Sequence, residues 1–93
     1  MATYEDLIMA IVKMQGKVIG RGIALHLARG VPGLEISEDG VAATYDGDPV
    51  TILENLVERY RKVERDVAIT LAKKAIEPLI AENPKLKVPE VLS

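Results

Sequence analysis

The sequence of 93 residues contains no cysteine, phenylalanine or tryptophan, and its aromatic residues are three tyrosines. The absence of cysteine excludes disulfides, thiolate metal sites and a cysteine nucleophile. Without phenylalanine or tryptophan, the apolar content has to come from Leu, Ile, Val, Ala and Met, which favours closely packed helices. A chain of this length is expected to form one domain with a thin core.

Residues suited to catalysis are also scarce. Serine occurs only at Ser37 and Ser93, and His26 is the single histidine. Ser37 stands in a predicted turn, and no neighbour of His26 at helical spacing would orient it as a base. Acidic residues near the turn offer oxygen atoms for a cation, but their Asp-Gly steps are ordinary turn chemistry. We therefore expect a protein that is not an enzyme and needs no metal or other cofactor.

Long apolar runs are missing as well. No stretch approaches the roughly 20 residues that cross a bilayer. Glu5 and Asp6 interrupt the N-terminus, so no secretory signal is expected there. The net charge of −2 says little about partners. A soluble cytoplasmic protein without a membrane partner is the expectation.

The first thirty residues show helical spacing. Thr3 and Asp6 form a short version of the capping box, and apolar residues follow at intervals of three and four. This pattern predicts a first helix over residues 4–14, a break near Gly16 to Gly20, and a second helix that ends at Arg29. A single bent helix is the alternative, because glycine weakens a helix without always ending it.

A β-hairpin is predicted next. Gly30 suits the position just after a helix, and Leu34 and Ile36 alternate with polar residues as in a short strand. Residues 37–40, Ser-Glu-Asp-Gly, form the predicted turn, and residues 41–45 the return strand. Asp48 and Pro49 then have the residue types of an N-cap and a first helical position.

From Val50 the apolar pattern is helical for some thirty residues. It predicts one helix of about 45 Å, at 1.5 Å per residue, that reaches about Ile80. Pro78 is expected to kink this helix or to begin a terminal turn, and Asn83-Pro84 ends it. The expected fold is thus α+β in the order α-α-β-β-α, with residues 1–83 as one domain and residues 84–93 as a loosely ordered tail.

A helix of that length would extend beyond so small a domain and expose its apolar side. We therefore predict a homodimer in which a second copy covers this side. The expected interface residues repeat along the helix at Leu53, Leu56, Tyr60, Val63 and Val67.

Small residues recur at every fourth position from Gly16 to Ala28. Ala68, Ala72 and Ala75 form a comparable stripe in the second half of the chain. Two such stripes let helix backbones approach closely, near the low end of the usual 8–10 Å between axes. Ala72→Leu is accordingly expected to overpack this contact.

Positive charge gathers in one segment. No acidic residue lies between Asp6 and Glu35, whereas this interval contains Lys13, Lys17, Arg21 and Arg29. Basic side chains beside glycines at a helix start suit an anion such as phosphate. The spacing matches neither the Walker A motif nor the dinucleotide fingerprint. The GXXG loop of some RNA-binding modules is not matched either, because Ile23 occupies the second glycine position.

Two functional hypotheses follow. The first is a non-enzymatic, homodimeric protein-interaction or regulatory module with an unidentified protein partner. The alternative is the binding of nucleic acid or a phosphate-bearing ligand through the segment 13–29, although the acidic residues around the hairpin disfavour nucleic acid.

Overall fold

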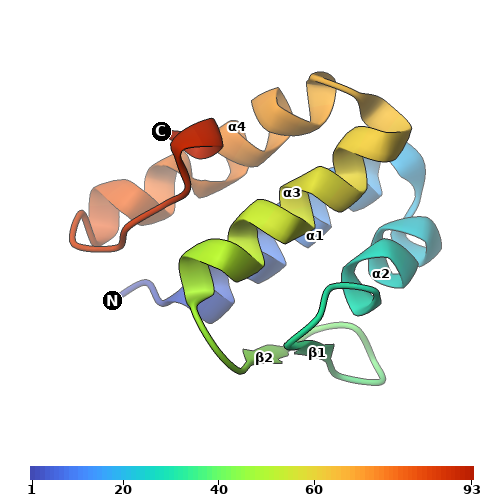
Figure 1. Cartoon of the computed structure of the whole chain (residues 1–93), viewed down its shortest axis with the longest axis horizontal. Helices are drawn as coiled ribbons and strands as arrows, with labels where there is room; N and C mark the ends of the chain where they lie inside the picture. Colours follow the sequence, from blue (N-terminus) through green and yellow to red (C-terminus); the bar gives the residue numbers. More distant parts are fainter.

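The computed structural model describes all 93 residues as an α+β arrangement of helices with one two-stranded hairpin (Figure 1). The elements, in chain order, are α1 (Tyr4–Ile19), α2 (Arg21–Arg29), β1 (Leu34–Ile36), β2 (Ala43–Tyr45), α3 (Pro49–Glu64), α4 (Val67–Glu82) and the short 3-10 helix η1 (Glu90–Leu92). The helix α1 is central and packs against α2, α4, α3 and the strand β2.

The predicted capping box opens α1. The Thr3 hydroxyl accepts a hydrogen bond from the backbone N–H of Asp6, and the Asp6 carboxylate accepts one from the N–H of Thr3. The helix then continues past Met14, where we predicted its end, because Gly16 stays helical. Gly20 ends it with a φ of 96°, a conformation that only glycine adopts easily. The predicted second helix, ending at Arg29, is confirmed.

Gly16 has a packing role inside α1. A Cβ at this position would lie 3.4 Å from the Cα of Arg21 and 3.8 Å from the Cβ of Ala24. These are ordinary van der Waals distances, so α2 lies directly against α1 at this position and leaves room for no more than a methyl group. Gly16 and Ala24 do meet, as their shared small size suggests, but across a helix–helix contact and not along one continuous helix.

The hairpin is confirmed, with shorter strands than predicted. β1 and β2 are antiparallel, and Leu34 pairs with Tyr45 while Ile36 pairs with Ala43. Residues 37–42 form the loop, in which the Ser37 hydroxyl accepts hydrogen bonds from the N–H groups of Val41 and Ala42. Val41 is consequently part of the loop and not of the return strand.

The prediction of one long C-terminal helix is wrong. The chain forms two helices of 16 residues, α3 and α4, which lie side by side (Figure 1). A rod of about 45 Å, at 1.5 Å per residue, would also exceed the longest dimension of the molecule, 31 Å. The predicted starting cap is confirmed, since the Asp48 carboxylate accepts from the N–H groups of Val50 and Thr51. Pro78 lies inside α4, which continues to Glu82.

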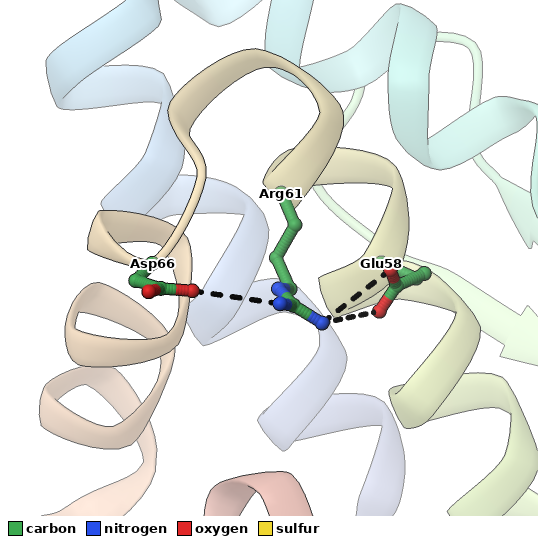
Figure 2. A network of polar contacts seen from close by, with 3 residues as sticks. All are labelled: Glu58, Arg61 and Asp66. Carbon is green, nitrogen blue, oxygen red and sulfur yellow. Dashed lines mark hydrogen bonds and ion pairs between the residues drawn. The ribbon is translucent and has the colours of Figure 1, made fainter.

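The break between α3 and α4 occurs at Arg65, which has a φ of 57°. Figure 2 shows the Arg61 side chain between Glu58 on its own helix and Asp66 just beyond the break. The N···O distances of these ion pairs are 3.0 and 3.5 Å. These partners are exposed, and exposed ion pairs contribute only about 0–1 kcal/mol each. The ion pairs accompany the break, but its main cause is the burial that it permits.

Folding back brings the apolar sides of α3 and α4 into one core. Leu53, Leu56 and Tyr60 of α3 are fully buried, as are Ala68 and Ala72 of α4. Each of the two helices packs on α1 as well as on the other. The overhang on which the dimer prediction depended therefore does not exist.

The final segment packs onto the rest of the chain. The Tyr4 hydroxyl donates to the backbone oxygen of Lys87 and accepts from its N–H, at 2.9 and 2.8 Å. Leu92 of η1 is buried in the core, and Asn83 donates to the carbonyl of Ala2 at 2.9 Å. Residues 84–93, predicted as a loose tail, thus have defined contacts near the N-terminus.

Candidate functional site

The candidate site is a hollow of about 440 Å³ between α1, α2 and the hairpin loop, which we call the basic groove. Its volume lies in the usual range of ligand sites. Val12 and Leu25 are buried beneath it, Met9 is half-buried, and Val41 is exposed at its edge. The lining residues are Met9, Val12, Lys13, Gly16, Lys17, Arg21, Leu25, Gly40 and Val41.

Close backbone approaches shape this groove. The break at Gly20 turns α2 back along α1 and so places Arg21 near Lys17. On the opposite side, Gly40 has a φ of 75°, and a Cβ there would lie 2.7 Å from Leu25 and 2.8 Å from the Arg21 guanidinium. A side chain at position 40 would strain the backbone at this φ and would require the ends of the Leu25 and Arg21 side chains to move.

Two arginines of α2 hold the loop in place. Arg21 donates to the carbonyl of Asp39 at 2.5 Å, and Arg29 donates to the carbonyls of Ser37 and Glu38 at 2.8 and 3.3 Å. The Asp39 carboxylate is occupied within the loop, where the Ser37 hydroxyl donates to it at 2.6 Å. This hydrogen bond is the main reason why the pKa of Asp39 is lowered, so the carboxylate stays ionised beside Arg21.

The basic groove has positive charge without compensation among its lining residues. It is lined by three cationic side chains and no acidic one. Lys13 and Lys17 are exposed, and none of the three ion pairs of the structure involves them. An anion entering the groove would therefore not need to displace an existing carboxylate partner from either lysine.

The structure brings together three of the four residues predicted to contact an anion. Lys13, Lys17 and Arg21 line the basic groove, whereas Arg29 does not. Arg29 is at the far end of α2 and holds the hairpin loop through its carbonyl contacts. Its role in the structure is therefore to position the wall of the groove.

The residues predicted for a dimer interface divide into two groups. Leu53, Leu56 and Tyr60 are 0 % exposed within the chain's own core, so this fold leaves them no surface for a partner. The Tyr60 hydroxyl donates to the carbonyl of Ala24 at 2.8 Å, and burial raises the pKa of Tyr60. Val63 and Val67 are 53 % and 54 % exposed beside the break. The homodimer itself stays a prediction.

Sequence reasoning missed the apolar members of the site. Met9 was not singled out in the helical pattern of residues 4–14, and Val41 was placed in a strand. Val41 directly follows the Asp-Gly turn and is 63 % exposed in the structure. Its nearness to Met9 depends on how the hairpin packs, which local pattern does not reveal.

Comparisons with models of protein families, with curated proteins and with solved structures find no match to this chain. No three His, Asp or Glu residues are grouped as a metal site requires. None of the helices has the combined length and apolarity of a bilayer-spanning segment.

Proposed function

We propose that this chain is a non-enzymatic protein-interaction module and that the basic groove is its recognition surface. The observation that carries the proposal is the combination of an apolar base with three cationic side chains at the rim. Sites that bind other molecules commonly combine apolar surface with a few polar groups that fix orientation. The hairpin loop and α2 hold this surface in shape before any partner arrives.

The chemistry of the lining supports binding more than catalysis. The groove presents lysine and arginine but no serine, threonine, histidine or carboxylate. It therefore lacks a nucleophile paired with a base, which most hydrolytic and transfer reactions require. His26, the single histidine, is exposed on α2 and is not among the residues that line the groove.

The second candidate function is the binding of a phosphate-bearing ligand or single-stranded nucleic acid. The observation in its favour is that Lys13, Lys17 and Arg21 surround one end of the groove. Against it, the groove contains no aromatic side chain on which a base would stack. The acidic residues Glu38 and Asp39 lie on the adjoining loop and would repel a nucleic acid backbone.

Selection from a displayed library of random peptides tests the proposed function. The target is the full chain, and the blocking variant is Val41→Asp, which puts a charge on the exposed edge of the groove. Ile23→Asp is the matched control, because Ile23 is a similarly exposed apolar residue (53 %) outside the groove. We expect selected peptides to bind the wild type and Ile23→Asp equally, and Val41→Asp at least about tenfold more weakly.

Two results would contradict the proposal. Peptides that bind all three proteins equally would place recognition elsewhere on the surface. Failure to select any peptide, together with salt-dependent binding of single-stranded RNA to the wild type, would favour the second candidate.

A further inference from the structure

The basic groove continues along α1 into a second hollow of about 460 Å³. Met9, Lys13 and Val41 line both hollows, so the two are contiguous. The second one is bounded by residues 41–43 and by Leu79 of α4, and it reaches Glu5 and Asp6 at the start of α1. Together they form one strip, which we call the α1 channel.

The α1 channel follows a single face of the helix. Asp6, Met9, Ala10, Lys13, Gly16 and Lys17 are spaced by three or four residues, so they lie on one side of α1. The buried residues Leu7, Ile11 and Gln15 project from the opposite side. From Asp6 to Lys17 the channel is about 16 Å long at 1.5 Å per residue, which is three helical turns.

Charge is unequally distributed along this channel. Glu5 and Asp6 are at one end, whereas Lys13, Lys17 and Arg21 occupy the middle and the other end. Apolar surface from Met9, Val41 and Leu79 lies between the two ends. Three cationic side chains stand against two carboxylates along the channel, so its net charge is positive.

Resting on the proposed function, we infer that the α1 channel binds an amphipathic helix of a partner protein with carboxylates at the end that meets Lys13, Lys17 and Arg21. A helix placed in a groove contributes apolar side chains at i, i+3 or i+4, and i+7. The channel spans three turns of α1, so a ligand helix of three turns lying along it has the same length. Its acidic residues complement the three cations, and its apolar stripe covers Met9, Val41 and Leu79.

Other occupants fit this channel less well. A small molecule would fill only one of the two contiguous hollows, whereas a helix of three turns covers both. A second copy of the chain related by two-fold symmetry would face the channel with an identical hollow, and two hollows do not fill one another. Nucleic acid would meet Glu5 and Asp6 at one end, and it would gain little from the apolar surface between the ends.

Three synthetic peptides of 16 residues test the inference. All have the same number of leucines. The first has leucine at helical spacing and glutamate at its polar positions, the second has lysine in place of glutamate, and the third has the first peptide's composition in scrambled order. Titration calorimetry gives affinity, NMR shifts of the labelled chain give the site, and circular dichroism gives peptide helicity.

We expect the first peptide to bind at least about tenfold more tightly than either of the others at 50 mM salt. Its advantage over the lysine peptide should shrink at 500 mM salt, because salt screens exposed charge pairs. It should gain helicity on binding and shift the signals of Met9, Val41 and Leu79. Lys13→Glu combined with Lys17→Glu should abolish this preference and favour the lysine peptide. Lys73→Glu combined with Lys74→Glu, on exposed positions of α4, is the matched control and should change nothing.

Lys13→Gln with Lys17→Gln repeats the test without adding negative charge near the end of α1, in case the first double variant does not fold.

Equal binding of the scrambled peptide, or a bound peptide that stays extended, would overturn the inference. If library selection yields groove-binding peptides without an acidic helical pattern, the inference fails while the proposed function stands. If Val41→Asp alters the binding of no peptide at all, both fail.

Discussion

Two breaks between consecutive helices have different physical origins. Gly20 separates α1 from α2 with a φ of 96°, and Arg65 separates α3 from α4 with a φ of 57°. Glycine adopts such a conformation at little steric cost, whereas an arginine there costs of order 1–3 kcal/mol. The first break is thus permitted by the residue itself, but the second must be stabilised by its surroundings.

Burial outweighs the strain at Arg65. The fold-back brings the buried side of α4, which includes Ile76 at 2 % exposure, into the common core. Covering one side chain of this size contributes roughly 1.5–3 kcal/mol. Ala68 and Ala72, both fully buried, add to it. A strained residue in a chain reversal is therefore tolerated when the helices that it joins gain more from packing than the strain costs.

The substitution with the largest expected effect is Ala72→Leu, which tests the packing of α4 that the break at Arg65 makes possible. Ala72 is 0 % exposed on α4, which packs closely against α1. Ala72→Leu should lower the free energy of unfolding by about 1–3 kcal/mol, because extra methylene groups overpack a filled interface. Urea denaturation measures this change. An unaltered midpoint would show that α4 is not held tightly against α1.

At the first break, Gly20→Ala isolates the backbone effect. No atom lies within 4 Å of the added Cβ, so only the φ of 96° opposes the substitution. We expect Gly20→Ala to lower the free energy of unfolding by about 2 kcal/mol, measured by thermal denaturation. Gly22→Ala is the control, because position 22 is equally open but helical. This substitution should raise the free energy of unfolding by roughly 0.5–1 kcal/mol. Equal effects at both positions would contradict a strained conformation at Gly20.

At the second break, Arg65→Gly should stabilise the protein by about 1 kcal/mol, because glycine relieves the positive φ at the expense of a more flexible unfolded chain. Arg65→Ala keeps the strain and removes the side chain, so its stability should stay close to that of the wild type. Chemical denaturation of the three proteins gives the comparison. A destabilised glycine variant would mean that the arginine side chain itself holds the reversal.

The smallest effect concerns Glu64, the residue before Arg65. Both its carboxylate oxygens are shielded from solvent and lack hydrogen-bond partners, and burial raises its pKa above the ordinary value. Because the folded state favours the protonated acid, the contribution of Glu64 to stability is fully present below the unfolded pKa. It is lost as the pH rises through the folded pKa.

Glu64→Gln should therefore raise stability at pH 7 by less than about 1 kcal/mol, since solvent screens a partly exposed group. The gain should vanish near pH 4. Melting curves of both proteins between pH 4 and 7.5 would show the difference, and Glu58→Gln is the exposed control. A gain that is independent of pH would exclude burial of the charge as its cause.

Local chemistry in the sequence predicted the elements that begin or end on a specific residue type. The capping box at Thr3, the cap at Asp48, the hairpin over residues 34–45 and the end of α4 before Asn83 all occur as expected. The cations of the candidate site were found from charge alone, but its apolar part was not. Met9, Val41 and Leu79 are distant in sequence, and only packing makes them neighbours.

The amino-acid sequence by itself determined where helices are capped, where glycine permits a break, and which faces are apolar. Only the tertiary structure decided that the apolar stripe from Leu53 to Leu79 folds upon itself at Arg65, and that the far side of α1 stays open as a channel. The physical reason is that the spacing of apolar residues shows which face of a helix must be buried. Which other element buries that face depends on the arrangement that buries the most apolar surface of the whole chain.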